Sequence, residues 1–484
     1  MIVAADGEVL ASAQERYTTL QPRPYHEEQD PVLVATATYR AIQQCTQNAG
    51  DAARQIVAMG VSSQMYSVLA LDADGAPLTN SMIWADARAE TQAHQLRAEF
   101  GWRLYHKTGC PPSSMFPVAK IRWLREQDPD RFARCAEFMS IKEYVLRPFL
   151  AERVVDASVA SSMGLLDIHC GDWSDDALAF AGLQRAQLPT PCSGLIVFAA
   201  ANPTFCRQLG LPTSLPIVLA GGDGPLASIG AGALTPGVIN VDLGTSGAAR
   251  LISQRAITDE ATGLWCFRLT DDLWTVGGIL TNVGNALEWL IKRLALTLPA
   301  DGEQNANLWQ AIADRIPDDS DGLFFLPYLR RPRSPHWDDQ LSGTLFGLRA
   351  DHHIGHITRA LLEAIGYDLR AIIAALERHG GVIDAIRLTG GMARLPATSQ
   401  ILADILGKCV SVIEQTEASL RGAAAFAFAG VGVMPLDTFA SANLTTAAEI
   451  QPDAHRHQRY TAKYLVHNQL VDISRQASTI LHIT

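Results

Sequence analysis

The chain is poor in the features that mark metal-binding, redox and membrane proteins. Its eight cysteines are scattered along 484 residues without a C-x-x-C pair, which excludes metal and redox motifs of that type. Residues 1–13 carry neither the basic leader nor the apolar segment of a signal peptide. The longest run of small apolar residues, 422–434, is too short to span a bilayer and predicts a tightly packed core helix. We therefore expect a cytoplasmic protein with reduced thiols and no membrane partner.

The chain also lacks an excess of positive charge. It has 39 basic and 50 acidic side chains, for a net charge of -11. An acidic surface repels phosphate backbones, so nucleic acid is not expected as a partner. The contents of 48% hydrophobic and 18% charged residues are typical of a globular protein. A length of 484 residues exceeds what one hydrophobic core normally serves, which predicts two large domains.

Strand and helix signals alternate along the chain. It opens with a hairpin pattern over residues 2–10, and Asp30-Pro31 starts a helix that extends to about residue 47. Further strands are expected at 56–61, 67–71, 82–84, 216–220, 238–243, 249–252 and 386–389, and helices at 87–100, from 225, and at 359–377. This alternation predicts α/β layers, and we place the domain boundary near Gly230, which gives domains of residues 1–229 and 230–484.

No Walker A loop is present, so a phosphate site would need another glycine-rich turn. Gly244-Thr245-Ser246-Gly247 follows a strand of β-branched residues, and its backbone N–H groups and hydroxyls could meet phosphate oxygens. The same tetrapeptide is also a common hairpin turn. Gly390-Gly391 presents a similar choice, between a flat surface for a ring such as adenine and a plain strand-to-helix turn.

Asp223 lies in a Gly-Gly-Asp-Gly segment between a buried strand and a helix start. A carboxylate at the C-terminal end of such a strand faces the usual ligand site of α/β proteins, where it could accept the proton of a substrate hydroxyl. The alternative is a helix N-cap without chemistry.

Two distant motifs decide between these alternatives. Residues 115–124, M-F-P-V-A-K-I-R-W-L, followed by Glu126-Gln127, resemble the first signature of the FGGY carbohydrate kinases. Residues 343–348, G-T-L-F-G-L, with His356-Ile357 and residues 360–363, are similar to the second signature of that family. The resemblance extends in order from the first hairpin to about Pro435.

The resemblance implies an α/β fold of two ribonuclease-H-like domains, as in actin, hexokinase and Hsp70, with a central cleft for ATP and sugar. It implies that Asp223 is the catalytic base. The implied ATP-binding residues are Gly244, Thr245, Ser246, Gly284, Glu288, Gly391 and Met392. The implied substrate-binding residues are Gln64, Met65, Trp84 and Asp86. Trp84 could instead be core packing, and Asp86 could cap the following helix. Lys120 and Trp123 belong to a signature and receive no chemical role.

We therefore expect a carbohydrate kinase that uses ATP and Mg²⁺, with the metal ligands unassigned, and a small-molecule sugar or sugar acid as its partner. A homodimer is left open. An Hsp70-like or actin-like ATPase is disfavoured because both sugar-kinase signatures are intact.

Three stretches, at residues 108–115, 140–146 and 156–165, look like the gluconate kinases of this family, while xylulokinases share the general plan. The sequence departs from the family pattern at Tyr66, where a histidine is usual, and at Ser113. It also departs at Arg331-Pro332-Arg333, which stands where Gly-Glu-Arg is usual. Gluconate is the expected substrate, D-xylulose or another pentulose or polyol is the alternative, and a non-catalytic sugar- or nucleotide-binding protein is the alternative of another class.

Related kinases begin with a strand and an Asp-x-Gly-Thr-Thr loop that cradles phosphate opposite residues 244–246. This chain opens at what looks like the next strand, so we expect the first strand and phosphate loop to be missing from domain 1–229. Either the start has been placed roughly a dozen residues too late, a length that suits one strand and a loop, or the chain is a weak or inactive truncated member. We favour the first explanation.

Overall fold

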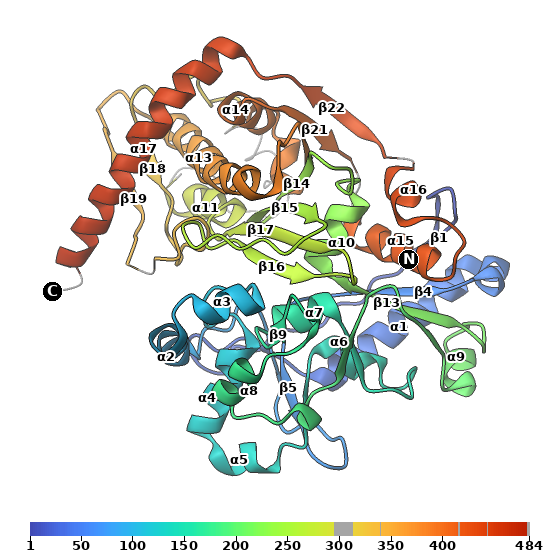
Figure 1. Ribbon diagram of the computed structural model, residues 1–484. Helices are drawn as coiled ribbons and strands as arrows, with labels where there is room; N and C mark the ends of the chain where they lie inside the picture. Colours follow the sequence, from blue (N-terminus) through green and yellow to red (C-terminus); the bar gives the residue numbers. More distant parts are fainter. Residues whose placement is uncertain (295–312, 339, 415–416, 443, 482–484) are drawn as a thin grey trace.

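The computed structural model describes residues 1–484 except 295–312, 339, 415–416, 443 and 482–484. Figure 1 shows two α/β halves, one above the other, with the chain passing from the lower to the upper half through β13 and α10. Among the described residues, every helix is too short or too polar to cross a membrane.

The N-terminal half contains mostly short elements. Its helices are α1 (Pro31–Ala49), α2 (Glu90–Phe100), α3 (Arg103–Thr108), α4 (Pro117–Gln127), α5 (Pro129–Arg134), α6 (Ile141–Leu146), α7 (Ala157–Ser162), α8 (Asp175–Ala181), α9 (Pro203–Gln208) and α10 (Asp223–Gly230), with 3-10 helices η1 (Gly50–Gln55) and η2 (Arg185–Gln187). Its strands are β1 (Ile2–Val3), β2 (Val9–Ala11), β3 (Glu28–Gln29), β4 (Met59–Ser63), β5 (Leu69–Leu71), β6 (Ser81–Met82), β7 (Glu137–Met139), β8 (Val154–Asp156), β9 (Leu166–Asp167), β10 (Asp172–Trp173), β11 (Thr190–Cys192), β12 (Val197–Ala199) and β13 (Pro216–Gly222).

The C-terminal half has longer elements. Its strands are β14 (Val238–Leu243), β15 (Gly247–Ser253), β16 (Trp265–Arg268), β17 (Trp274–Leu280), β18 (Phe324–Leu326), β19 (Thr344–Phe346), β20 (Ala385–Thr389), β21 (Cys409–Ile413) and β22 (Thr446–Ile450). Its helices are α11 (Gly284–Trp289), α13 (Ile354–Gly380), α14 (Pro396–Leu406), α15 (Ala418–Gly430), α16 (Leu436–Ser441) and α17 (Ala454–Leu481), with the π-helix η3 (Leu290–Leu294) and the 3-10 helix η5 (Gly391–Arg394).

The largest sheet within the described residues lies in the C-terminal half and has the order β16-β17-β15-β14-β20-β21-β22. Strands β16, β17, β15 and β14 are antiparallel, whereas β14, β20 and β21 are parallel. Apolar residues of this sheet and of α13 and α14 form one core, with Val241, Leu388 and Leu369 fully buried. Parallel β14 and β20 therefore end at the same edge, where α/β folds place their ligands.

The N-terminal half has a smaller sheet. Among the described residues, β13 pairs with β12 on one side and runs parallel to β4 on the other. Strands β1 and β2 form the expected hairpin as a separate two-stranded sheet. The expectation that a further strand and phosphate loop belong before this hairpin stays a prediction.

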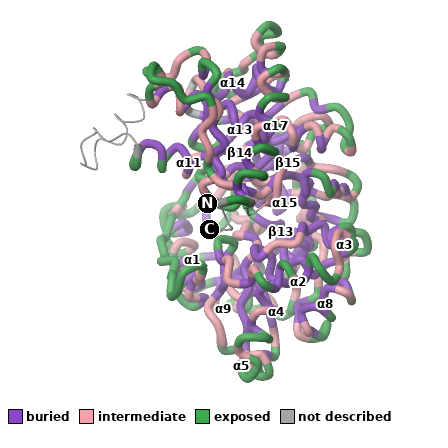
Figure 2. Tube along the Cα trace, turned by 90° about the vertical axis from the view of Figure 1, so that its left-hand side faces the viewer, coloured by how far each residue is buried: buried purple, intermediate pink, exposed green. Residues whose placement is uncertain are grey.

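The two halves meet through closely packed helices. Helix α15 confirms the predicted tightly packed helix, and it lies against α10, β4 and β13. A Cβ on Gly422 would lie 2.0 Å from the carbonyl oxygen of Leu226, so only glycine allows this approach of α15 to α10. Figure 2 shows that the chain at β14, β15, α15 and β13, in the middle of the molecule, is mostly buried.

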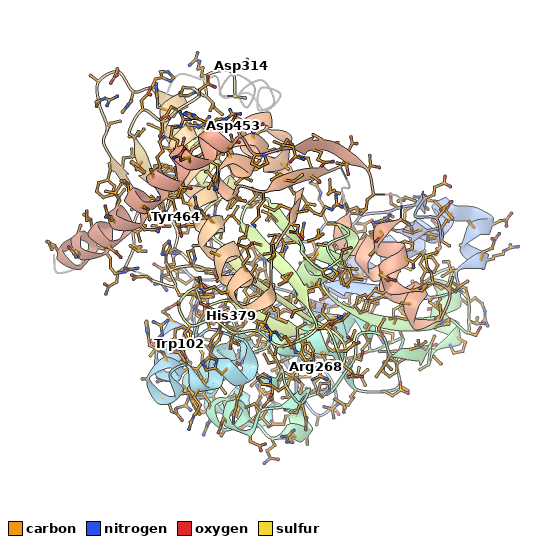
Figure 3. All side chains as sticks on the ribbon, turned by 45° about the horizontal axis from the view of Figure 1, so that its top comes forward. Trp102, Arg268, Asp314, His379, Asp453 and Tyr464 are labelled. Atoms are coloured by element: carbon orange, nitrogen blue, oxygen red, sulfur yellow. The ribbon has the colours of Figure 1, made fainter. Side chains whose placement is uncertain are left out.

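A second junction lies near β16 and β17. Trp274 Nε1 donates to the carbonyl of Ile168 at 2.9 Å, and Arg268 Nη1 donates to the carbonyl of His169 at 2.8 Å. Figure 3 labels Arg268 where the sheet of the C-terminal half approaches the helices of the N-terminal half. The Tyr105 hydroxyl donates to the carbonyl of Leu264 at 2.6 Å. These bonds fix one side of the two halves relative to each other.

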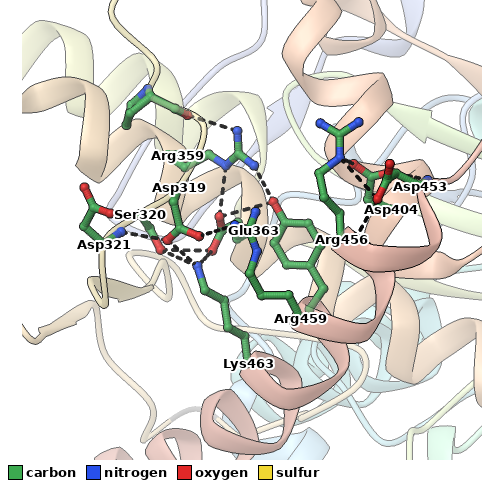
Figure 4. A network of polar contacts seen from close by, with 12 residues as sticks. Asp319, Ser320, Asp321, Arg359, Glu363, Asp404, Asp453, Arg456, Arg459 and Lys463 are labelled. Atoms are coloured by element: carbon green, nitrogen blue, oxygen red, sulfur yellow. Dashed lines mark hydrogen bonds and ion pairs between the residues drawn. The ribbon is translucent and has the colours of Figure 1, made fainter.

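The C-terminal helix α17 is tied to α13 by a buried polar network, shown in Figure 4. Glu363 on α13 accepts from Arg359 Nε at 2.9 Å and from Ser320 Oγ at 3.1 Å. Lys463 on α17 lies 3.3 Å from the same carboxylate and 2.8 Å from Asp319. Because each charge has an opposite charge beside it, the network holds α17 against the core without leaving a buried charge unpaired.

Several predicted boundaries shift. The strand expected at 56–61 is β4, Met59–Ser63, because Gly50–Gln55 forms a 3-10 helix first. The helix expected from residue 87 begins at Glu90. The helix expected at 359–377 is confirmed and is longer, Ile354–Gly380.

Candidate active site

Asp223 follows β13 directly and is the first residue of α10. The N-cap of α10 is Gly222, and no side chain caps this helix, so the alternative of Asp223 as an N-cap is wrong. Ala220 has φ 55°, and the pairing of β13 with β4 shifts register between Val218 and Gly221. Such a bulge re-aims the end of a strand, here the end that carries Asp223.

A buried ion pair supports this strand end. Lys142 Nζ donates to Asp156 Oδ2 at 2.6 Å, and both side chains are buried. The same ammonium donates to the carbonyls of Leu219 and Gly221. Lys142 thus clamps the bulged end of β13 immediately before Asp223.

Ser158 completes the support. Its hydroxyl donates to Asp156 Oδ1 at 2.7 Å and accepts from Gly222 N at 2.7 Å. Two of the three stretches that look like gluconate kinases, 140–146 and 156–165, therefore meet beneath Asp223. Their role here is to hold the strand end.

The carboxylate of Asp223 is accessible and has few partners. Its Oδ1 accepts from Gly224 N at 2.8 Å. Desolvation by the surrounding protein raises the pKa of Asp223, the Gly224 bond and the charge of Arg250 oppose this, and the charge of Asp242 adds to it. A carboxylate with a raised pKa and an open lone pair suits proton transfer.

Gln64 and Met65, the first pair of residues predicted to bind the phosphate acceptor, lie beside Asp223. Ser63 of β4 is in register with Gly222 of parallel β13, so Gln64 and Asp223 leave neighbouring strands at the same edge. Gln64 Nε2 donates to Gln29 Oε1 at 2.7 Å. Met65 is buried, and a Cβ on Gly222 would lie 2.5 Å from Met65 Cγ. Met65 thus packs under the strand end that carries Asp223.

Trp84 and Asp86, the second pair of residues predicted to bind the acceptor, differ from each other in exposure. Trp84 is 43% exposed, so core packing is the wrong interpretation for this indole. Asp86 is buried and accepts from Glu27 N at 2.8 Å and from Arg88 Nη2 at 2.7 Å. Asp86 does not cap a helix, because α2 begins later with Ala89 as its N-cap. Its visible role is to hold Arg88, whose guanidinium lies 4.9 Å from the Trp123 ring centroid.

The predicted phosphate hairpin joins β14 to β15. Gly244 N donates to the carbonyl of Ser246 at 2.9 Å, and Thr245 is exposed. The N-terminus of α11 closes on this turn, because Gly284 N donates to the carbonyl of Gly244 at 3.1 Å. A Cβ on Gly284 would lie 2.4 Å from that carbonyl oxygen. Glu288 lies one turn further along α11, is exposed and pairs with Lys292.

Gly391 follows β20 at the same edge of the sheet, because β14 and β20 are parallel with Asp242 opposite Thr389. Gly390 and Gly391 are exposed, and a Cβ on Gly391 would meet no atom within 4 Å. The side chain of Met392 is buried in the core of the C-terminal half. The surface offered to a ring is therefore glycine backbone, with Met392 behind it.

Two charged residues of this region were not predicted, Asp242 and Arg250. Asp242 precedes the phosphate hairpin and accepts from Thr389 Oγ1 at 3.0 Å. Arg250 lies on β15 with its guanidinium over Gly224. The signal that could have found both is a charged residue inside an otherwise apolar strand.

Two cavities among the described residues lie away from these residues. One of about 800 Å³ is lined by Glu28, Arg88 and Trp123 among others, and one of about 520 Å³ by His94, Trp102 and others. Neither includes a predicted site residue, so the position of Asp223 rests on strand-end geometry and not on a cavity.

Family models match both halves of the chain. The FGGY family of carbohydrate kinases, N-terminal domain, matches residues 1–230, and the C-terminal domain of the same family matches residues 239–431. The chain belongs to the FGGY family of carbohydrate kinases.

Individual relatives agree with this membership. A gluconokinase of Bacillus licheniformis is 32% identical over 463 residues, which is 94% of this chain and 88% of the relative. A xylulose kinase of Escherichia coli strain K12 is 28% identical, over 84% of this chain and 82% of the relative. The crystal structure of gluconate kinase from Lactobacillus acidophilus matches with a TM-score of 0.89 and 25% identity, over 96% of this chain and 93% of that one. These matches confirm the predicted two-domain fold of the actin and hexokinase type.

The first FGGY signature has a structural role here. It forms α4, and its fully buried Lys120 donates to the carbonyls of Ile83 at 2.6 Å and Tyr66 at 3.1 Å. Burial lowers the pKa of Lys120 to about 7, and the charge of Asp86 opposes this shift. Lys120 thereby joins the segments that follow β4 and β6, both of which carry predicted acceptor residues.

The departures from the FGGY pattern lie in this region. Tyr66 has φ 66°, and its ring lies 5.7 Å from Phe116 and 6.0 Å from Phe267. Burial raises the pKa of Tyr66, while the positive charges of Arg250 and Arg333 lower it. Arg333 belongs to the segment that replaces Gly-Glu-Arg, so two of the departures, Tyr66 and Arg333, lie within electrostatic reach of each other.

Proposed function

We propose that this FGGY kinase transfers the γ-phosphate of ATP to the terminal hydroxyl of a sugar acid, with gluconate as the substrate and 6-phosphogluconate as the product. The observation that carries the proposal is the accessible carboxylate of Asp223 at the end of β13. The strand end is held by residues from two stretches that resemble gluconate kinases in sequence. The gluconokinase relative, 32% identical over 94% of this chain, supports the choice of acceptor.

In the proposed mechanism Asp223 accepts the proton of the attacking hydroxyl. Its desolvation keeps the pKa raised, which favours proton capture during transfer. Gln64 and Met65 orient the acceptor from the neighbouring strand end, and Trp84 and Asp86 complete the pocket from the segment after β6. Lys142 and Ser158 keep the base in place without touching the substrate.

The nucleotide would lie along the edge of the large sheet. Backbone N–H groups of Gly244, Thr245 and Ser246 would meet its phosphates, and Gly391 with Met392 would form the wall for adenosine. Gly284 and Glu288 would contribute from α11, with Gly284 allowing the helix to close on the hairpin.

Mg²⁺, when bound, would neutralise charge on the phosphates. The described residues contain no cluster of three or more His, Cys, Asp or Glu side chains that could hold an ion. This fits an ion held mainly by phosphate oxygens and water with one or two carboxylates. Asp242, which lies just before the phosphate hairpin, would be the carboxylate on this chain.

The remaining predictions stay proposals. These are a domain boundary at residues 229 and 230, a cytoplasmic location and, as an open point, a homodimer. D-xylulose is the second candidate acceptor, since the xylulose kinase of Escherichia coli is 28% identical over 84% of this chain. A non-catalytic binding protein is the candidate of another class.

A coupled ADP-release assay tests the proposal. The acceptors are gluconate, xylulose, ribulose, glycerol and related polyols, each with ATP and Mg²⁺, with and without a chelator. We expect turnover that requires metal, ATP and acceptor together, and a larger kcat/KM for gluconate than for D-xylulose. A larger kcat/KM for D-xylulose would replace the acceptor, and binding without turnover for every acceptor would favour the non-catalytic alternative.

A further inference from the structure

Arg250 reaches from the C-terminal half to the start of α10. It lies on β15 opposite Asn240 of β14 and Gly277 of β17. A Cβ on Gly224 would lie 3.1 Å from Arg250 Nε and 3.2 Å from Nη2. The guanidinium therefore lies against the backbone of the residue that follows Asp223.

The guanidinium of Arg250 lacks hydrogen-bond partners within the described part of the chain. Its Nη1 is buried and has no hydrogen-bond partner there. No carboxylate of the described residues forms an ion pair with it, whereas Arg88 pairs with Glu28 and Asp86. Arg268 donates from Nε and Nη1 to the carbonyls of Thr270 and His169. A buried donor without a partner is destabilising, so its retention points to a ligand that it binds.

The groups around Arg250 indicate the position of that ligand. Burial raises the pKa of Asp223 and that of Tyr66, and the positive charge of Arg250 opposes both shifts. Arg250 and Asp223 form no ion pair, since their charged atoms do not approach within 4.0 Å. The guanidinium thus lies beside the proposed base without an ion pair to it.

We propose that Arg250 binds the oxyanion of the phosphoryl group while it passes from ATP to the acceptor, and so acts as a catalytic residue. In this step the acceptor oxygen forms a bond to the γ-phosphorus and the bond from that phosphorus to the β–γ bridging oxygen breaks. ADP leaves with the bonding electron pair, and the hydroxyl proton passes to Asp223. Arg250 offers two fork-like donors to the equatorial oxygens, whose charge it neutralises. This inference rests on the proposed function.

The position of Arg250 favours the phosphoryl group over the carboxylate of a sugar acid. The attacking oxygen must lie within hydrogen-bond reach of Asp223, and the phosphorus bonds to that oxygen. The carboxylate lies at the opposite end of the carbon chain from the terminal hydroxyl. Since Arg250 lies beside Asp223, an oxyanion at the reacting end meets it.

The kinetic test compares Arg250→Met, Arg250→Lys and the control Arg255→Met. Arg255 follows the same strand, and its exposed side chain donates only to the carbonyl of His379 among the described residues. We expect Arg250→Met to lower kcat about 10²-fold or more, with the KM values for acceptor and ATP changed by less than about threefold. Arg250→Lys should recover part of the loss, and Arg255→Met should behave like the unmodified chain.

A comparison of a charged with a neutral acceptor shows whether Arg250 contacts the phosphoryl group or the carboxylate of the acceptor. A loss of kcat that is equal for gluconate and for a neutral acceptor supports a phosphoryl contact. A rise in KM for gluconate alone, with kcat retained, would overturn the proposal and assign Arg250 to the carboxylate. If gluconate is not turned over, the comparison uses whichever acceptor is, so that failure of the proposed substrate does not remove the test.

A binding measurement gives a readout that does not need turnover. The probe is ADP with Mg²⁺ and aluminium fluoride, an analogue of the phosphoryl group in transfer, measured by calorimetry beside ADP with Mg²⁺ alone. We expect Arg250→Met to weaken binding of the analogue at least tenfold and to leave ADP binding unchanged. Equal binding of the analogue by Arg250→Met and the unmodified chain would overturn the proposal.

Discussion

Asp86 and Asp223 each follow a strand of the N-terminal half, the first predicted to bind the acceptor and the second predicted to be the catalytic base, yet their carboxylates have different surroundings. Asp86 is 1% exposed, and its oxygens accept from Arg88 and from the backbone N–H of Glu27. Asp223 is exposed, and its carboxylate accepts from Gly224 N. The Asp86 carboxylate is paired with a cation, whereas the Asp223 carboxylate can accept further hydrogen bonds.

The difference shows that a carboxylate near a substrate site can have either a structural or a proton-accepting role. A buried carboxylate paired with arginine fixes a segment, and its charge is already neutralised. A carboxylate with a raised pKa and open lone pairs is suited to take up a proton. We therefore propose that Asp86 shapes the acceptor pocket through Arg88 and that Asp223 is the general base.

The largest expected stability effect concerns the support of Asp223. Lys142→Met leaves Asp156 buried without its cation and removes the clamp on Leu219 and Gly221. We expect a loss of about 3–5 kcal/mol in the free energy of unfolding. Urea unfolding followed by circular dichroism measures it.

The matched control is Lys107→Met. Lys107 forms a pair of similar length with Asp176, but both side chains are partly exposed to water. Its loss should cost no more than about 1 kcal/mol. Equal losses for the two variants would mean that the pair beneath Asp223 is not a structural clamp.

Asp86→Asn should give the next largest effect. The change leaves Arg88 with Glu28 as its remaining acidic partner, and we expect a loss of about 1–3 kcal/mol in the free energy of unfolding. The KM for the acceptor should rise, while kcat should stay within about threefold. A drop in kcat at unchanged KM would show that Asp86 takes part in chemistry and would remove the contrast with Asp223.

Gly284→Ala tests the nucleotide side, away from both carboxylates. The added Cβ would lie 2.4 Å from the carbonyl oxygen of Gly244, so the helix must move off the phosphate hairpin. We expect the KM for ATP to rise about tenfold, or about 1.4 kcal/mol, with the KM for the acceptor unchanged. Steady-state kinetics with each substrate varied in turn gives both constants.

Glu143→Gln should show its effect only as a change in the pH dependence of stability. Burial raises the pKa of Glu143 from 4.5 to about 7. Between about pH 4.5 and 7 the folded chain therefore holds a proton that the unfolded chain has released, so this contribution to stability is full below pH 4.5 and is lost as pH rises to 7.

Glutamine stays neutral and can keep the bond from Ser140 N that the carboxylate now accepts at 2.7 Å. The free energy of unfolding of the unmodified chain should therefore fall, relative to that of Glu143→Gln, as the pH rises from 5 to 8. Parallel pH curves for the two proteins would mean that Glu143 is ionised in the folded chain.

Local signals were enough for the strand end and the hairpin turn. An apolar strand that runs into Gly-Gly-Asp-Gly predicts where Asp223 lies, and the Gly-Thr-Ser-Gly turn lies between paired β14 and β15 as expected. The support by Lys142 was not predictable in this way, because it bonds to carbonyls 77 and 79 residues further along the chain. The position of Arg250 likewise depends on how two halves pack together.

The sequence was ambiguous where helix starts compete. Asp86 was a reasonable cap for a helix from residue 87, but that helix begins at Glu90, and a buried arginine takes the carboxylate instead. Asp223 also had the pattern of a cap, yet Gly222 occupies that position. In both cases the outcome depends on a tertiary contact that propensity does not contain.

The most direct test of the account is a single-turnover measurement of phosphoryl transfer by Asp223→Asn, with ATP, Mg²⁺ and saturating acceptor. The substitution keeps the volume and the bond to Gly224 N but removes the proton acceptor. We predict a rate about 10²–10⁴-fold below that of the unmodified chain, with little change in acceptor affinity and an unchanged unfolding curve. A near-normal rate for Asp223→Asn would contradict the assignment of Asp223 as the general base.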